Sequence, residues 1–435
     1  MYSEEGILKT VITNVWSDKN KGDYALVESI IRMAYDIDKN AQISAITFCS
    51  AQESFFSEDY YYERSEGISV FGSLHRTFYN REFPDPYSRL AHHVLAFVGF
   101  AIRVAVIGLM GKQAIHLMSK QYRESFGAMC DADIILVKGG GYITSGIGLV
   151  SDITYFYRVC SSMIVASILG KKFIICGASV WDVKSSMAKS VLRWIIDKSA
   201  MTIIREKKTE KYLLEFIGIK KDRIRILMDF AFYLKKHYEV PIKCPIDVNG
   251  YAIGLTVKAY FGKTVQMEYL QGITKIVEGL LKNGKTVYIL PQTLGPAGNS
   301  CLPIMILLKK RFSDNERVVL VEKEYSLQEM FCLYSKMNYT IGTQFHSVIF
   351  SLLVNTPVIA IAYEKHKAHG IMEMMGMSDF AFDYDNLDVD GILDKIRYIE
   401  TNGAQIRDMI SRALNDRINR DYESLIELVR SIISR

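Results

Sequence analysis

The sequence predicts an α/β protein of two domains, each built around a parallel sheet. Three observations lead to this prediction. Short apolar runs alternate with helical patterns along most of the chain, as in sheets whose parallel strands are joined by helices. The alternation stops at Lys235–Asn249, a stretch with two prolines and several charges, and then resumes. At 435 residues, the chain is also longer than one ordinary domain.

The N-terminal half reads as a first domain, covering residues 1–240. Its predicted strands are Leu8–Val15, Ile43–Phe48, Ile134–Val137, Phe173–Cys176 and Thr202–Ile204, and its predicted helices are Ala25–Ala34, Tyr155–Leu169, Met187–Ser199 and Thr209–Phe216. Residues 51–86 are rich in aromatic side chains and show no regular period, so we expect an irregular insertion or lid loop there. We expect this aromatic and apolar insertion to extend to about residue 130.

The pattern restarts after the linker and predicts a second domain over residues 250–385. Its strands are predicted at Tyr251–Val257, Thr286–Leu290, Val318–Val321, Tyr339–Ile341 and Val358–Ile361, with helices at Met267–Leu281, Leu302–Lys310 and Leu327–Ser335. Residues 386–435 carry apolar side chains at three- and four-residue spacing, which predicts C-terminal helices. Because open parallel sheets bind ligands at the carboxyl ends of their strands, we expect the two domains to face a cleft.

Composition excludes several function classes. The net charge is only +5, and Lys and Arg are scattered, so a nucleic-acid partner is not expected. Seven cysteines without a CxxC pair indicate reduced thiols and a cytoplasmic protein. The polar start of the chain has no signal-peptide pattern.

The segment Val94–Met110 is apolar apart from Arg103. Three interpretations fit it: a helix buried in the core, a helix lying on a membrane surface, or a short transmembrane span. Its length is at the lower limit for a span, and a central arginine is costly in lipid. A peripheral position on the membrane therefore stays open beside the core helix.

The most informative run extends from Gly342 to Phe350 and continues through the predicted strand to Lys365. His346 begins an apolar helical pattern, and a helix N-terminus favours anions. Lys365, His366 and Lys367 follow the strand, where a parallel sheet presents its ligand loops. Imidazole side chains exchange protons near neutral pH. The combination predicts chemistry on a phosphorylated or carboxylated small molecule, with His346 transferring the proton.

Other candidate positions keep two interpretations each. Arg205 opens a helix after a strand and either binds an anion or forms a surface salt bridge with Glu206. Lys258 follows a strand and is a ligand candidate or a solvated loop charge, as is Lys365. The Gly139–Gly141 run, with Gly140 and Gly141 as candidate ligand contacts, either lets backbone approach a ligand or forms a tight strand-to-helix turn. Asp23 is a site residue or a helix N-cap. No residue set has metal-ligand spacing, so no metal is expected.

Six segments in order carry a resemblance to a known family. They are Gly22-Asp23-Tyr24-Ala25, Ala132-Asp133 through Gly141, Ile204-Arg205-Glu206, Asp229-Phe230-Ala231-Phe232, Leu290-Pro291-Gln292 with Gly295-Pro296, and Gly342 through Lys365 to Gly370-Ile371-Met372. From residue 10 to about residue 380 the chain resembles the polysaccharide pyruvyltransferases. The resemblance implies two Rossmann-like domains in a GT-B-like arrangement. It also implies transfer of a pyruvyl group from phosphoenolpyruvate to a saccharide, forming a ketal, with phosphoenolpyruvate as co-substrate and no other cofactor.

One departure from the family pattern concerns Gln344, which stands where the family usually has arginine. An amide cannot replace the charge of a guanidinium that grips a carboxylate or phosphate. Gln344 is therefore either a ligand contact of a variant site or the mark of a non-catalytic relative. A GT-B glycosyltransferase that uses a sugar nucleotide is the third possibility, although no Glu-x₇-Glu pattern surrounds Glu364. For the leading interpretation we expect a lipid-linked saccharide acceptor in exopolysaccharide, capsule or cell-wall assembly.

Overall fold

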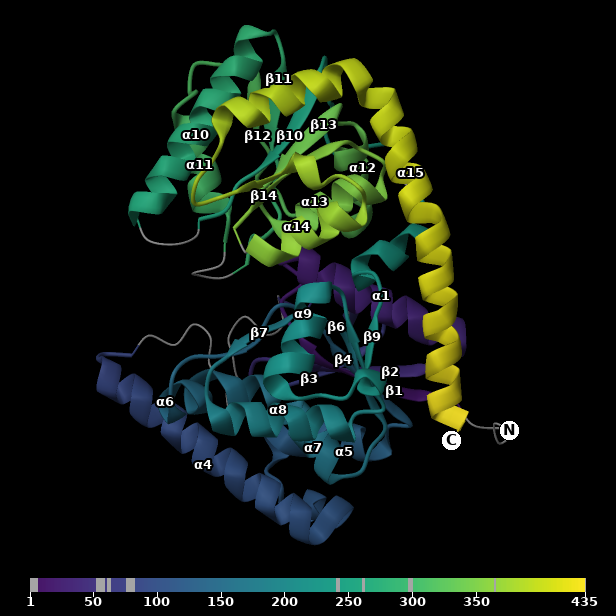
Figure 1. The fold of residues 1–435 in the computed structure, drawn as a ribbon. Helices are drawn as coiled ribbons and strands as arrows, with labels where there is room; N and C mark the ends of the chain where they lie inside the picture. Colours follow the sequence, from purple (N-terminus) through teal and green to yellow (C-terminus); the bar gives the residue numbers. More distant parts are fainter. Residues whose placement is uncertain are drawn as a thin grey trace. The chain divides into compact units, whose positions relative to one another are not determined.

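The computed structural model describes residues 7–51, 59–60, 64–75, 83–239, 243–259, 263–295, 300–363 and 365–434, the side chains of Lys263, Lys365 and His366 excepted. Contacts divide the chain into two compact units. The first comprises residues 1–18, 26–230 and 421–435, and the second comprises residues 19–25 and 231–420. Figure 1 shows a sheet flanked by helices in each unit.

A seven-stranded sheet with the order β3-β2-β1-β4-β6-β8-β9 organises the first unit. All its paired strands are parallel. Its strands are β1 (Lys9–Val15), β2 (Gln42–Thr47), β3 (Ser69–Phe71), β4 (Ile134–Lys138), β6 (Phe173–Ala178), β8 (Met201–Ile204) and β9 (Ile224–Ile226). A separate two-stranded sheet pairs β5 (Ile143–Ser145) with β7 (Val180–Val183).

The helical segments of the first unit lie around this sheet. They are α1 (Lys21–Ile37, whose first turn belongs to the second unit), α4 (Pro86–Met110), η1 (Gly111–Leu117), α5 (Lys120–Asp131), α6 (Leu149–Ser151), η2 (Asp152–Phe156), α7 (Tyr157–Ile168), α8 (Ser186–Lys198), α9 (Lys207–Tyr212), η3 (Leu213–Ile217) and η4 (Lys221–Arg223). Ser185 caps α8 by accepting a hydrogen bond from the backbone N–H of Ala188.

The second unit contains a six-stranded parallel sheet with the order β12-β11-β10-β13-β14-β15. Its strands are β10 (Ala252–Thr256), β11 (Thr286–Ile289), β12 (Val318–Leu320), β13 (Tyr339–Gly342), β14 (Val358–Ala362) and β15 (Ala381–Asp383). Its helical segments are η5 (Phe230–Lys236), α10 (Lys263–Lys282), α11 (Leu302–Lys310), α12 (Leu327–Ser335), α13 (Phe345–Leu353), α14 (Lys365–Met374) and η6 (Ser378–Phe380). Helix α15 (Val389–Ser434) follows and ends within the first unit.

Burial explains why the central strands were visible in the sequence. Every residue of β4, β10 and β14 is buried, as expected for parallel strands covered by helices on both faces. Such strands appear as short continuous apolar runs between helical patterns. The prediction of an α/β protein with parallel sheets is confirmed.

The domain ranges differ from the predicted ones at three places. The change of unit falls between residues 230 and 231, before the predicted linker, and residues 19–25 belong to the second unit. The C-terminal region is one helical run with non-helical backbone only at Asn402, and its last residues, 421–435, belong to the first unit. The expectation that residues 51–86 are irregular is wrong at β3, which pairs with β2 at the edge of the sheet.

Two other expectations need correction. Cys244 and Cys332 form a disulfide, so the prediction of reduced thiols is wrong for this pair, whereas the other five cysteines are buried and belong to no disulfide. Since disulfides are uncommon in cytoplasmic proteins, the cytoplasmic compartment stays a prediction. The interpretation of residues 94–110 as a core helix is also wrong, because α4 buries only Ala96, Phe100 and Ile107.

Candidate active site

Three neighbouring strands of the second unit bring four predicted site residues to one edge of a sheet. Strand β13 lies between β10 and β14, and all three run parallel. Lys258 follows β10, Gln344 and His346 follow β13, and Lys365 follows β14. The carboxyl ends of parallel strands are where α/β proteins place their ligand loops. This edge is therefore the candidate active site.

His346 lies in the first turn of α13 and is half-buried. The helix follows β13 directly, and its N-cap residue, Gln344, provides no side-chain cap. Backbone N–H groups at such a helix start point toward its N-terminus and favour a negatively charged ligand. An imidazole in this position can exchange a proton with an anion held at the helix end.

A short segment from the beginning of the chain packs against this histidine. A Cβ atom added to Gly22 would lie 2.1 Å from His346 Nδ1, so only glycine allows this approach. The segment is held by hydrogen bonds from Lys21 N to Gln292 O (3.0 Å) and from Leu294 N to Lys19 O (3.0 Å). It therefore fixes one side of the imidazole.

The same segment carries a buried cation. Lys21 is 3% exposed, and its Nζ lies 2.8 Å from Glu324 Oε1. Asp23 is neither the N-cap nor an isolated acid, because Asn20 Nδ2 donates to its carboxylate (2.6 Å). Asn20 Oδ1 accepts hydrogen bonds from the backbone N–H groups of Gly22 (3.2 Å) and Asp23 (3.4 Å). Asn20 thus caps α1, and the N-cap interpretation of Asp23 is wrong.

Gln344 uses both ends of its amide inside the protein. Its Nε2 donates to the carbonyl of Val257 (3.1 Å), and its Oε1 accepts a hydrogen bond from Thr293 Oγ1 (3.1 Å). The side chain is 5% exposed. It joins the loop after β10 to the segment after β11. The geometry favours a structural role for Gln344 over direct contact with a ligand.

We expect Gln344→Arg to destabilise the protein rather than to raise its activity. The larger cation would enter a buried position shaped for a neutral amide and would break both hydrogen bonds, which costs about 2–5 kcal/mol. Thermal unfolding of Gln344→Arg and of the shape-conserving Gln344→Met measures this cost, and Gln344→Met should lose less. An arginine variant as stable as the natural chain and more active would contradict the structural role.

Other charged groups of the second unit lie near this edge of the sheet. The carbonyl of Lys258, the half-buried residue after β10, accepts a hydrogen bond from Tyr384 Oη (3.1 Å). Lys367 in α14 is 6% exposed. His369 Nε2 lies 2.9 Å from Asp383 Oδ1, so this imidazole is oriented by a carboxylate. In the part of the chain that the structure describes, no group of His, Cys, Asp and Glu gathers as metal ligands do.

The Gly139–Gly141 run lies in the first unit, after β4. A Cβ on Gly139 would lie 2.2 Å from the carbonyl oxygen of Cys176, and Gly140 has a φ of +145°. Trp181 Nε1 donates to the carbonyl of Gly141 (3.4 Å). The run leads to β5 and not to a helix, so the expected strand-to-helix turn is wrong. Close packing against the end of β6 accounts for Gly139, and the positive φ accounts for Gly140.

Arg205 is buried and paired. Its Nε donates to Ser179 Oγ (2.7 Å), and its Nη1 forms an ion pair with Asp229. Arg205 is 2% exposed, and the Asp229 side chain is fully buried. The alternative of a surface salt bridge with Glu206 is wrong, because Glu206 accepts a hydrogen bond from Thr209 instead (2.8 Å). The arrangement favours a positioning role for Arg205 at the carboxyl ends of β6 and β8.

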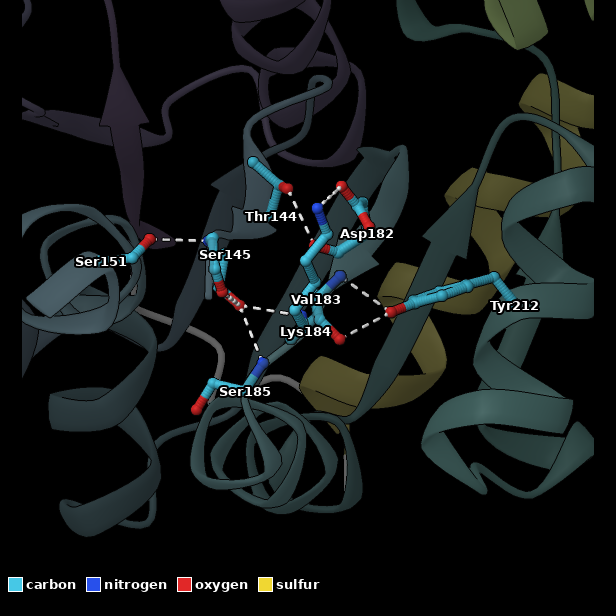
Figure 2. Close-up of polar contacts among 9 residues, drawn as sticks. Thr144, Ser145, Ser151, Asp182, Val183, Lys184, Ser185 and Tyr212 are labelled. Carbon is cyan, nitrogen blue, oxygen red and sulfur yellow. Dashed lines mark hydrogen bonds and ion pairs between the residues drawn. The ribbon is translucent and has the colours of Figure 1, made fainter. Parts of the chain in front are cut away.

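A polar network stiffens the adjoining loops, as Figure 2 shows. Ser145 Oγ accepts hydrogen bonds from the backbone N–H groups of Lys184 (3.1 Å) and Ser185 (3.5 Å). The Tyr212 hydroxyl accepts from Val183 N (2.8 Å) and donates to Val183 O (3.0 Å). These bonds hold β5 and β7 against α9. The loops beside Gly141 and Ser179 therefore have a fixed backbone.

A family model described as polysaccharide pyruvyl transferase matches residues 20–366, which is most of the chain. The chain belongs to this family. The amylovoran biosynthesis protein AmsJ of Erwinia amylovora is 22% identical over 422 residues, covering 91% of this chain and 92% of AmsJ. This pyruvyl transferase family member therefore resembles a protein named for amylovoran biosynthesis along nearly its whole length.

Solved structures support the fold of this family member. A putative UDP-N-acetylglucosamine 2-epimerase from Listeria monocytogenes has a TM-score of 0.58 at 11% identity, with 98% of this chain and 96% of that chain covered. A glycosyltransferase from Rickettsia africae has a TM-score of 0.53 at 11% identity, with 98% and 99% covered. The predicted GT-B-like fold with two Rossmann-like domains is confirmed. At such low identity the likeness concerns the fold alone.

Sequence reasoning missed two buried lysines of this family member. Neither Lys21 nor Lys138 was among the candidate site residues. Lys138 is fully buried at the end of β4, with its Nζ 5.2 Å from the centre of the Tyr142 ring. The sequence did contain a signal for the burial of Lys138, because this lysine ends an otherwise apolar strand and directly precedes the glycine run.

Proposed function

We propose that this chain transfers the pyruvyl group of phosphoenolpyruvate to two hydroxyls of a saccharide and forms a ketal. The observation that carries the proposal is the position of His346 at the start of α13, with Gly22 packed against its imidazole, in a chain of the pyruvyl transferase family. The acceptor is a lipid-linked saccharide of exopolysaccharide, capsule or cell-wall assembly. The likeness to AmsJ supports the exopolysaccharide class.

The reaction needs cations and one proton donor. Phosphoenolpyruvate carries a carboxylate and a phosphate. The N-terminus of α13 and Lys258 would supply positive charge at one sheet edge, and Lys365, which begins α14 after β14, is a further candidate cation. Gly140 and Gly141 let backbone approach a ligand in the first unit. No cofactor beyond phosphoenolpyruvate enters the proposal, and the protein acts on the cytoplasmic side, where phosphoenolpyruvate is made.

The atoms balance in two steps. In the first, His346 gives a proton to the methylene carbon of phosphoenolpyruvate, and a saccharide hydroxyl oxygen bonds to the neighbouring carbon and releases its proton. In the second, another hydroxyl oxygen of the same saccharide bonds to that carbon and releases its proton, and phosphate leaves with the electrons of the broken C–O bond. The products are a methyl-bearing ketal and inorganic phosphate. In this proposal His346 is the general acid that gives the first proton.

The contacts of Gln344 weaken the case for a non-catalytic relative. That case rested on Gln344 standing where the family usually has an arginine that binds an anion. Because the amide is engaged by Val257 and Thr293, the residue serves the scaffold that positions His346. Its presence is therefore compatible with a working site that uses other cations.

Calorimetric titration with phosphoenolpyruvate tests the proposal without knowledge of the acceptor. We expect saturable binding of phosphoenolpyruvate that weakens about tenfold in Lys258→Ala, since a charge-assisted contact is worth about 1.5–3 kcal/mol. Lys282→Ala, at the end of α10, is the matched control and should bind normally. Binding of a UDP-sugar with no response to phosphoenolpyruvate would favour the glycosyltransferase function instead.

A further inference from the structure

Helix α4 presents an uninterrupted apolar face to solvent. Every exposed position from 90 to 110 is Leu, Ala, Val, Ile, Gly or Met. The exposed fractions of Leu95, Ile102 and Leu109 are 72%, 60% and 88%. In Figure 1, α4 runs along the outer side of its unit. Large continuous apolar patches are uncommon on soluble monomers and mark interaction surfaces.

The opposite side of α4 is fixed to the first unit. Ala96, Phe100 and Ile107 form a buried stripe at helical spacing. Arg103 also turns inward, with its guanidinium carbon 4.0 Å from the centre of the Tyr122 ring and a hydrogen bond to the carbonyl of Leu74 (3.3 Å). The one cation within the apolar stretch is therefore removed from the outer face. The helix is long and apolar enough to cross a bilayer, but the contacts of its inner side hold it along its own unit.

More apolar side chains are exposed close to the start of α4. Ile147, Leu149 and Val150 are 84%, 55% and 57% exposed. They belong to the loop and short helix α6 that lead into η2, which contacts α4. The apolar surface thus continues beyond a single helix.

A cationic cavity opens beside the first turns of α4. It has a volume of about 290 Å³ and is lined by Pro86, Arg89, Leu90, His93, Thr154, Tyr155 and Arg158. Burial, and then the charges of Arg158, His92 and Arg89, lower the pKa of His93 to about 4. The charged neighbours of this imidazole are thus cations. The carboxylate of Asp85 is bound by the backbone N–H groups of Tyr87 (2.8 Å) and Ser88 (2.9 Å).

The charged residues in and after α4, as far as Arg123, are all basic. From Pro86 to Arg123 the chain has no aspartate or glutamate, whereas Arg89, Lys112 and Lys120 lie near the two ends of the apolar stretch. All three of these cations are exposed. An apolar face with cationic ends complements an interface that is apolar inside and anionic at its rim.

We infer that the outer face of α4 docks on the surface of a bilayer that contains anionic phospholipids, with a lipid phosphate in the cavity between Arg89 and Arg158. Leu95, Ile102 and Leu109 enter the acyl boundary, and the cations at both ends contact headgroups. The docking does not depend on pyruvyl transfer, but it would bring the protein to lipid-linked acceptors. A second copy of this chain is disfavoured as the occupant, because two such segments would bring their cations together.

Flotation with lipid vesicles tests the docking. We expect the natural chain to bind vesicles of phosphatidylcholine with phosphatidylglycerol and to bind pure phosphatidylcholine vesicles more weakly. Leu95→Glu with Leu109→Glu should lower the partition coefficient at least tenfold, because two apolar contacts are replaced by charges. Arg89→Gln should lower it about fivefold on the anionic vesicles only. Leu307→Glu and Arg412→Gln, exposed positions of the second unit, are the matched controls.

The outcomes separate the possible occupants. Circular dichroism should be unchanged in all variants, since the substituted side chains are exposed. Equal vesicle binding by the natural chain and the double glutamate variant would overturn the docking. A dimer in sedimentation velocity that dissociates in this variant, without vesicle binding, would identify a second copy instead. Vesicle binding that is insensitive both to Arg89→Gln and to competition by free glycerol phosphate would overturn the headgroup cavity.

Discussion

We expect the His346→Gln protein to transfer pyruvyl groups about 10²–10⁴ times more slowly than the natural chain, because general acid catalysis contributes a factor of this size. Glutamine keeps hydrogen-bonding capacity but cannot release a proton to carbon. The residue is half-buried, so the fold should persist. The measurement is the rate of phosphate release from phosphoenolpyruvate in the presence of an acceptor extract from producing cells.

Gly22 provides a companion variant that leaves the imidazole in place. In Gly22→Ala, the new Cβ would lie 2.1 Å from Nδ1, so His346 must move. Because misplacement of a catalytic group by about 1 Å can cost a factor of 10², a loss approaching that of His346→Gln is expected. Gly403→Ala is the matched control, since no heavy atom lies within 4 Å of its added Cβ. A fully active Gly22→Ala protein would refute a catalytic role for His346 in the observed position.

Removal of the Asp229 carboxylate should have the largest effect on stability. Asp229→Ala leaves the Arg205 guanidinium buried without its ionic partner, which costs about 3–5 kcal/mol. Trp16, Trp181 and Trp194 are the three tryptophans of the chain, and all belong to the first unit. Urea unfolding followed by tryptophan fluorescence therefore reports on the unit that holds the pair.

A double variant separates the structural role of the pair from donor binding. Arg205→Met with Asp229→Leu removes both charges, so it should be more stable than Asp229→Ala alone. If Arg205 only positions the loops, this variant binds phosphoenolpyruvate within about threefold of the natural affinity. Loss of binding in a folded double variant would assign Arg205 to the donor site. A cost below about 1 kcal/mol for Asp229→Ala would contradict the buried pair.

The central strands could be predicted because burial on both faces imposes a local pattern. Strand β14, with the sequence Val-Ile-Ala-Ile-Ala, has no polar residue. The edge strand β3 has only three residues and lies within an aromatic stretch, so no period reveals it. The sequence also could not predict that α4 is exposed, because an apolar helix has the same composition whether protein or lipid contacts its apolar face. Composition cannot distinguish these environments.

The candidate site was partly predictable for a similar reason. His346 belongs to a contiguous strand–helix pattern, whereas its contact with Gly22 joins residues far apart in the chain. A salt bridge with the neighbouring Glu206 was one of two interpretations of Arg205, but the fold brings Asp229 to it from the segment after β9. Gln344 was interpreted either as a ligand contact of a variant site or as the mark of a non-catalytic relative, because its bonds to Val257 and Thr293 depend on tertiary structure. Pairings between distant residues follow from topology and leave no local pattern.

The unit that contains His346 is not contiguous in the gene. Its body begins at residue 231, but residues 19–25 belong to it and supply Gly22 and the buried Lys21. A fragment that starts at the linker would encode the histidine without the glycine that packs against it. Chimeras that exchange halves between relatives would combine the two groups from different parents. Acceptor specificity is therefore better changed by exchanging loops than by exchanging halves of the chain. Residues 19–25 and the body of the second unit must come from the same parent.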